Sequence, residues 1–300
     1  MLYDPAMARA RCNGIELEYE VAGNPTDPPV LLIMGLGAQL VVWDEEFVLG
    51  LARRGHFVIR YDNRDVGLST RFEGSPAPAI PELLARRAAG ETVAVPYLLH
   101  DMADDAAALL DHLEIAAAHV VGASMGGMIA QTLAVRHPRR VRTLVSIMSS
   151  TGNPELPPAK PEAMARLMVP APSERAAYIE HMLASQMVMS GSGFPLDPDA
   201  TRQLAGRLFD RAYYPAGVAR QLAAILASGS RVEALAALRT PTLVIHGLED
   251  PLVPVDAGVD THEAIAGSEL LLIDGLGHNL PRGVWPTVID AIQKHVALAT

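Results

Sequence analysis

The chain carries, directly after a short apolar run, the segment Val120-Val121-Gly122-Ala123-Ser124-Met125-Gly126-Gly127, which contains a G-x-S-x-G pattern. The mostly apolar segment 128–134 follows it, so the context predicts a strand, a sharp turn and a helix. Small residues on both sides of Ser124 let the strand and the helix pass close together and leave the serine exposed on a strained backbone. Ser124 is therefore a candidate nucleophile, although so short a pattern also fits a plain small-residue turn.

A carboxylate follows a later apolar run of strand length, which ends at Gly247. Asp250 lies on the loop after this run, immediately before a proline. Its close rival is Glu249, for which a solvated loop charge is the simpler interpretation. The end of the preceding predicted strand, 146–150, offers no carboxylate. We therefore expect Asp250 to be the acid of a Ser-His-Asp set, in the chain order Ser, Asp, His.

One of the ten histidines completes this order. His278 follows the apolar run 270–273 on a loop that contains Gly275 and Gly277. It would take the proton of the serine hydroxyl and return it to the leaving group, while the carboxylate fixes its tautomer. Five other histidines are explained by a helix end, a strand end or a position within a helix: His112, His137, His246, His262 and His295.

Backbone amides usually bind the oxyanion of the tetrahedral intermediate. Met125 supplies one candidate amide, because it directly follows the candidate nucleophile at the start of a predicted helix. The second candidate is Leu36, which lies between Gly35 and Gly37 after the apolar run 30–34. The same two glycines are compatible with a simple chain reversal that has no catalytic role.

Four segments resemble the α/β-hydrolase superfamily and, within it, the aclacinomycin methylesterase-like carboxylesterases: residues 34–37, 60–70, 120–127 and 241–251. Met34-Gly35 favours this group, since many superfamily members have His-Gly there. The resemblance covers about residues 13–150 and 231–295. It implies an α/β-hydrolase fold with a mostly parallel eight-stranded sheet, flanking helices and a helical cap insert.

The resemblance also implies that the segment 62–70 shapes the wall beside the active site. A simpler interpretation is that Asp62, Arg64 and Asp65 pair with one another on a surface loop, where such ion pairs contribute little to stability. This second interpretation is the one that we favour from the sequence.

The order of apolar patterns agrees with a parallel sheet covered on both faces. Strands are expected at 15–21, 29–34, 56–61, 118–122 and 141–148, and helices at 101–113 and 125–137. The alternation stops at the proline-rich segment 153–161. We therefore expect a core domain of residues 1–151 and 231–300 and a helical cap of residues 152–230.

The expected cap is rich in methionine and aromatic residues that could line an adaptable apolar pocket. For any single residue, ordinary packing within the cap is the interpretation that we favour. The residues concerned are Met164, Met168, Met182, Met187, Met189, Phe194, Phe209, Tyr213 and Tyr214.

Composition excludes several classes of function. The formal charge of −10 argues against binding to nucleic acid or to an anionic membrane surface. Cys12 is the only cysteine, so no intrachain disulfide can form and a reducing compartment fits. Residues 1–10 do not resemble a signal peptide, and no apolar run is long enough for a membrane span. We therefore expect a soluble, cytoplasmic protein with no membrane partner.

No zinc-type spacing and no phosphate-binding glycine loop occurs, so neither a metal nor another cofactor is expected. The sequence leaves the oligomeric state open.

These features predict a serine carboxylesterase that acts on a small hydrophobic partner, a short to medium-chain or methyl ester. The alternatives that keep Ser124 are haloperoxidase-like perhydrolysis and hydrolysis of a carbon–carbon bond. Epoxide hydrolases and dehalogenases fit less well, because those relatives use aspartate at this position. A non-enzymatic small-molecule binding module on the same fold also remains open.

Overall fold

The computed structural model describes residues 3–76, 79–89, 91 and 93–299. It contains an eight-stranded sheet with the order β1-β2-β4-β3-β5-β6-β7-β8. β1 pairs antiparallel with β2, β2 pairs antiparallel with β4, and the remaining neighbours are parallel. The strands are β1 (Tyr3–Cys12), β2 (Ile15–Ala22), β3 (Pro29–Ile33), β4 (Phe57–Tyr61), β5 (Ala118–Ala123), β6 (Val141–Ile147), β7 (Thr242–Gly247) and β8 (Glu269–Ile273). The predicted α/β-hydrolase architecture is confirmed.

Helices cover both faces of the sheet, which explains why its central strands are almost continuously apolar. Along β3, Leu31 and Ile33 pack into one core cluster and Val30 and Leu32 into the other. The first cluster includes side chains from α3 (Leu99–His112) and α4 (Met125–Arg136). The second includes side chains from α1 (Glu45–Ala52) and α11 (Trp285–Val296). Alternate residues of a strand thus pack into two separate cores, one on each face of the sheet.

The boundaries that the sequence predicts for five strands and two helices hold to within one or two residues. The clearest difference is α3, which begins at Leu99 rather than at Asp101. Asp101 is the third residue of that helix, where its carboxylate accepts a hydrogen bond from the amide of Leu98 at 2.7 Å. An acidic residue in the first turn of a helix therefore lies within the helix, because its carboxylate binds the amide of the residue that precedes the helix.

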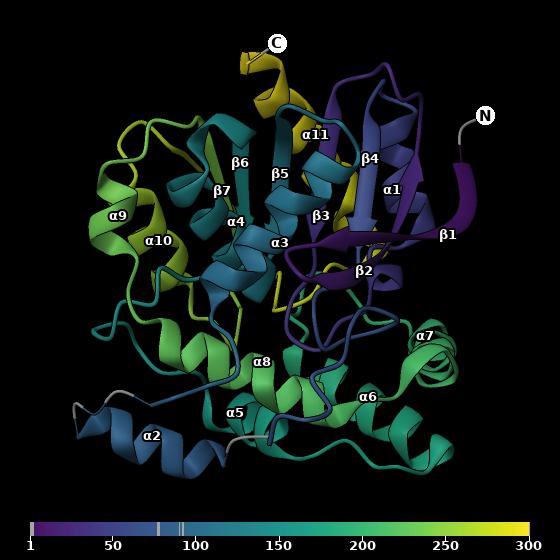
Figure 1. Cartoon of the computed structure of the whole chain (residues 1–300). Helices are drawn as coiled ribbons and strands as arrows, with labels where there is room; N and C mark the ends of the chain where they lie inside the picture. Colours follow the sequence, from purple (N-terminus) through teal and green to yellow (C-terminus); the bar gives the residue numbers. More distant parts are fainter. Residues whose placement is uncertain (1–2, 77–78, 90, 92, 300) are drawn as a thin grey trace.

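The chain between β6 and β7 forms most of a helical layer beyond the carboxyl ends of the parallel strands (Figure 1). The helices of this connection are α5 (Pro161–Met168), α6 (Arg175–Met189), α7 (Pro198–Ala212), α8 (Pro215–Ser228) and α9 (Val232–Ala236). The sequence did not predict α2 (Ile80–Ala88), which contacts α8 in the same layer. We call residues 152–230 the insert.

α10 (Val255–Ala264) follows β7. Within the described ranges, no helix is both long and apolar enough to cross a bilayer.

His119, on β5, is a buried base that makes stability depend on pH. Its Nδ1 lies 2.9 Å from the Thr143 hydroxyl, and burial lowers the pKa of the imidazole from 6.5 to about 4. The unfolded chain binds this proton below pH 6.5, but the folded chain binds it only near pH 4. The contribution of His119 is therefore complete above pH 6.5 and is lost between pH 6.5 and 4, by up to about 3 kcal/mol.

This loss is measured by urea unfolding of wild type and His119→Gln between pH 7 and 4. The free energy of unfolding of wild type minus that of the variant is expected to fall by up to about 3 kcal/mol over this range. A difference that does not change with pH would contradict the assignment, because all other titrating groups are common to both proteins.

Candidate active site

Ser124 lies on a sharp turn between β5 and α4 with φ 55° and ψ −121°. The turn needs glycine on both sides because backbone segments touch there. A Cβ on Gly122 would lie 2.1 Å from the carbonyl oxygen of Gly126, and a Cβ on Gly126 would lie 2.1 Å from that of Ile33. Positive φ at a serine is a strained conformation of the kind that collects at functional sites. The strained turn holds the hydroxyl at the end of the strand.

A continuous chain of hydrogen bonds joins Ser124, His278 and Asp250. Nε2 of His278 lies 3.0 Å from Oγ of Ser124, and Nδ1 lies 2.7 Å from Oδ2 of Asp250. The other carboxylate oxygen of Asp250 accepts hydrogen bonds from the amides of Leu252 at 2.9 Å and Val253 at 2.8 Å. These two amides fix the plane of the carboxylate. The structure thus brings together the three side chains that the sequence selected from separate loops.

Glu249, the rival acid, points elsewhere. Its carboxylate accepts hydrogen bonds from both the amide and the hydroxyl of Ser192, each at 2.6 Å. These bonds lower the pKa of Glu249 below its usual value. Glu249 therefore ties the β7–α10 loop to the insert and makes no contact with the imidazole of His278.

The two expected amide donors lie on the segments that border Ser124. Met125 is the first residue of α4, and the first amides of a helix have no partner within the helix. Leu36 belongs to the turn of residues 34–37. A Cβ on Gly35 would lie 3.1 Å from Cβ and 3.6 Å from Oγ of Ser124, so this turn passes directly beside the serine. Both segments therefore lie next to the side chain of Ser124.

A family model described as the alpha/beta hydrolase fold matches residues 28–281. The chain belongs to the α/β-hydrolase fold family.

Two relatives and one solved structure show what the chain is similar to. Rhodomycin D methylesterase DauP of Streptomyces sp. (strain C5) is 31% identical over 312 residues, covering 95% of this chain and 96% of that protein. The 2-hydroxy-6-oxononadienedioate/2-hydroxy-6-oxononatrienedioate hydrolase of Cupriavidus pinatubonensis is 29% identical and covers 57% of this chain and 58% of that protein. The solved structure of the meta-cleavage product hydrolase CumD of Pseudomonas fluorescens IP01 has a TM-score of 0.74 at 20% identity and covers 98% of both chains.

The segment that follows β4 in this α/β hydrolase is buried, so the surface-loop interpretation was wrong. Asp62 and Asp65 are fully buried and Arg64 is 5% exposed. Each pairs with a residue outside the segment: Asp62 with Arg211, Arg64 with Asp105, and Asp65 with Arg220. Arg211 lies on α7 and Arg220 on α8, so two of these pairs join the core to the insert. Burial raises the pKa of Asp62, and the Arg211 guanidinium opposes that shift.

The Asp65–Arg220 pair is expected to be a large stabilising contact of this hydrolase. Nε and Nη2 of Arg220 bind the two carboxylate oxygens at 2.8 and 2.9 Å, and the Tyr97 hydroxyl donates a third hydrogen bond to Asp65 at 2.7 Å. Arg220→Met would leave the carboxylate buried without its countercharge. We expect the free energy of unfolding to fall by about 3–5 kcal/mol, measured by urea denaturation.

The control for Arg220→Met is Arg175→Met, which breaks an equally well-formed pair on the surface. Nε and Nη2 of Arg175 bind Asp210 at 2.7 Å each, but the two side chains are 51% and 57% exposed. Loss of such an exposed, solvent-screened pair should change the free energy of unfolding far less than loss of the buried pair. Equal losses for the two variants would show that burial does not set the strength of the Asp65–Arg220 contact.

His246 also belongs to the site, although the sequence did not indicate a role for it there. Its Nε2 lies 2.8 Å from the carbonyl oxygen of Val253 and 3.6 Å from Oδ2 of Asp250. Burial lowers the pKa of this histidine, so the neutral ring is favoured. The available signal was its place on a buried strand, four residues before the candidate acid. His246 holds the loop that carries Asp250.

Three aromatic residues of the insert pack with one another. Tyr178, Phe209 and Tyr213 form a cluster with ring centroids 5.0–5.9 Å apart. Met187 is 64% exposed, whereas Met189 is buried and its carbonyl oxygen accepts a hydrogen bond from the His278 amide at 2.7 Å. Ordinary packing therefore explains this aromatic cluster. Met189 reaches the site through its backbone, which holds the loop that carries the histidine.

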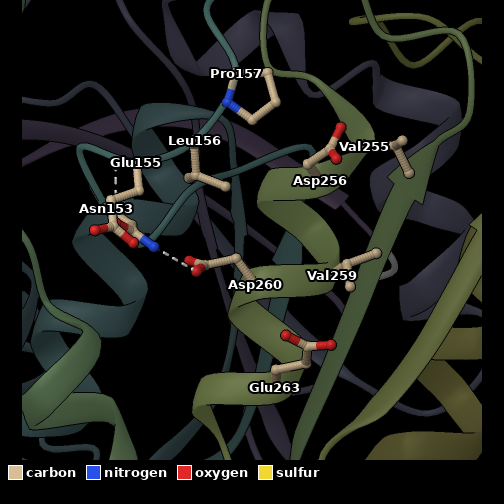
Figure 2. Close-up of a pocket in the computed structure, with 9 residues that line it drawn as sticks. All are labelled: Asn153, Glu155, Leu156, Pro157, Val255, Asp256, Val259, Asp260 and Glu263. Atoms are coloured by element: carbon tan, nitrogen blue, oxygen red, sulfur yellow. Dashed lines mark hydrogen bonds between the residues drawn. The ribbon is translucent and has the colours of Figure 1, made fainter.

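A surface cleft of about 390 Å³ lies between the segment 153–157 and α10 (Figure 2). Four carboxylates line it, those of Glu155, Asp256, Asp260 and Glu263. Asp260 is engaged, because it accepts a hydrogen bond from the Asn153 amide group at 2.8 Å. Ser124, Asp250 and His278 do not line this cleft.

Among the described residues, no three His, Cys, Asp or Glu side chains are grouped to hold a metal ion.

Proposed function

We propose that this α/β hydrolase is a serine carboxylesterase that cleaves short to medium-chain or methyl esters of hydrophobic acids. The observation that carries the proposal is the hydrogen-bond chain from Asp250 through His278 to Ser124. The full-length similarity to a rhodomycin D methylesterase supports ester hydrolysis. The insert would act as a cap over the site, and its contacts with the histidine and acid loops support that role.

The reaction would begin when Oγ of Ser124 attacks the ester carbonyl carbon while Nε2 of His278 accepts the hydroxyl proton. The carbonyl oxygen takes up the negative charge and is bound by the amides of Leu36 and Met125. Collapse of this intermediate breaks the bond to the alcohol oxygen, and His278 returns the proton to it. Water then attacks the acyl-enzyme in the same way and releases the acid and free Ser124.

Asp250 would keep the proton of neutral His278 on Nδ1, so that Nε2 can accept the serine proton. It would also stabilise the positive charge that the imidazole gains. The two amides that bind its other oxygen support this role, since they stop the carboxylate from rotating away.

Hydrolysis of a carbon–carbon bond is a second candidate. It is favoured by the partial similarity to the Cupriavidus hydrolase, whose name describes action on an oxo-dienedioate. Such a substrate also presents a carbonyl carbon that a serine or an activated water can attack, so the same three side chains would serve.

The test compares purified wild type on p-nitrophenyl esters with acyl chains of two to twelve carbons and on a vinylogous diketone. Activity on esters with an optimum in chain length is expected, and the optimum reports the size of the acyl site. Turnover of the diketone alone would replace the esterase proposal with carbon–carbon hydrolysis. Tight binding without turnover would favour a binding module.

A further inference from the structure

We propose that Gln221, on α8 of the insert, is a positioning residue that holds the 34–37 turn in its active geometry. This inference rests on the proposed ester hydrolysis, in which the amide of Leu36 binds the oxyanion. Oε1 of Gln221 accepts a hydrogen bond from the amide of Gly37 at 2.8 Å. Its Nε2 donates one to the carbonyl oxygen of Arg64 at 2.7 Å. A single side chain thus links the turn to the buried segment after β4.

The turn is held at its other end by the core. Nδ2 of Asn63 donates a hydrogen bond to the carbonyl oxygen of Met34 at 2.9 Å, and the amide of Ala38 donates one to the carbonyl oxygen of Gly35 at 3.2 Å. At Gly37, the turn is held by Gln221 of the insert. The orientation of the Leu36 amide is therefore fixed between a core contact on one side and an insert contact on the other.

The fit between α8 and the turn is also steric. Gly37 has φ +66°, and a Cβ at this position would lie 2.9 Å from Cγ2 of Val218. Gln221 is fully buried, so water cannot replace its hydrogen bonds. The neighbouring Arg220 anchors the same helix to Asp65. Gln221 therefore projects from a helix that is held in place, and the position of α8 is coupled to the conformation of the 34–37 turn.

The test is the kinetics of Gln221→Leu, which removes both hydrogen bonds and puts an apolar side chain of similar size in the place of the amide. Displacement of an oxyanion donor weakens transition-state binding more than substrate binding. We expect kcat for p-nitrophenyl butyrate to fall about 10- to 100-fold with KM changed by less than about 3-fold. The dissociation constant of an alkyl trifluoromethyl ketone, which forms a hemiketal oxyanion on Ser124, should rise by the same factor.

Gln131→Leu is the matched control, because Gln131 is also fully buried and makes two side-chain hydrogen bonds. These bonds join it to Ser146 and Arg231, away from the 34–37 turn. This variant should lower Tm while kcat stays within about 2-fold of wild type. Gln221→Glu keeps an acceptor for the Gly37 amide and should restore part of the kcat that Gln221→Leu loses.

An unchanged kcat and ketone affinity in Gln221→Leu would overturn the inference, as would an equal loss of kcat in Gln131→Leu. If Gln221→Leu does not fold, Gln221→Met carries the same expectations. Failure of the proposed function is a different result, in which wild type itself shows no Ser124-dependent ester hydrolysis. In that case, hemiketal formation followed by ¹⁹F NMR still compares the oxyanion site of wild type with that of the variant.

Discussion

Ser124→Ala is expected to lower kcat/KM for p-nitrophenyl esters by at least about 10⁴-fold, because it removes the hydroxyl that would form the acyl-enzyme. The positive φ of residue 124 is unfavourable for serine and alanine alike, so the stability of the fold should change little. The measurement is steady-state hydrolysis by purified protein, with circular dichroism to show that the variant is folded. A fluorophosphonate probe should label wild type and leave the variant unlabelled.

The control for this variant is Ser146→Ala on β6. Ser146 is buried, and its backbone pairs with that of Gly122 in the neighbouring strand. Its hydroxyl accepts a hydrogen bond from Gln131 at 3.1 Å and makes none with His278. Activity of Ser146→Ala should stay within a few-fold of wild type. Retention of full activity by Ser124→Ala would eliminate the serine mechanism.

The architecture could be predicted because each parallel strand is a short apolar run with a turn signal at its end. Residues that follow such strands gather at one edge of the sheet, so the G-x-S-x-G pattern, the loop positions and the chain order together selected Ser124, Asp250 and His278. Glycine supplied the second local signal, since the backbone approach at Gly122 and Gly126 excludes any side chain. These features are local in sequence and need no knowledge of distant partners.

The contacts between the core and the insert could not be predicted in this way. Charges on a loop are usually exposed, so Asp62, Arg64 and Asp65 suggested a surface position. Their burial depends on partners far along the chain, such as Arg211 and Arg220, which lie on amphipathic helices with no sequence pattern that marks their targets. The part that Gln221 plays was hidden for the same reason, because its contacts join residues 184 and 157 positions away.

Asp250→Asn is expected to lower kcat by about 10³- to 10⁴-fold, and the geometry of the acid explains why. The amides of Leu252 and Val253 donate to one oxygen of Asp250, and an asparagine must therefore place its carbonyl oxygen there. Its NH₂ group would then face Nδ1 of His278. Nδ1 would become a hydrogen-bond acceptor and Nε2 would carry the proton, so the imidazole could no longer accept a proton from Ser124.

Glu249→Gln provides the matched control, because it makes the same change from acid to amide one residue earlier. The carboxylate of Glu249 binds Ser192 of the insert and does not contact His278. Its kcat should stay within a few-fold of wild type. Steady-state kinetics of both variants therefore decide which carboxylate orients His278. Loss of activity only in Asp250→Asn would establish Asp250 as the acid. Loss of activity only in Glu249→Gln would assign that role to Glu249. The prediction depends on the two loop amides, since without them the asparagine could turn its carbonyl oxygen toward Nδ1 and preserve the active tautomer.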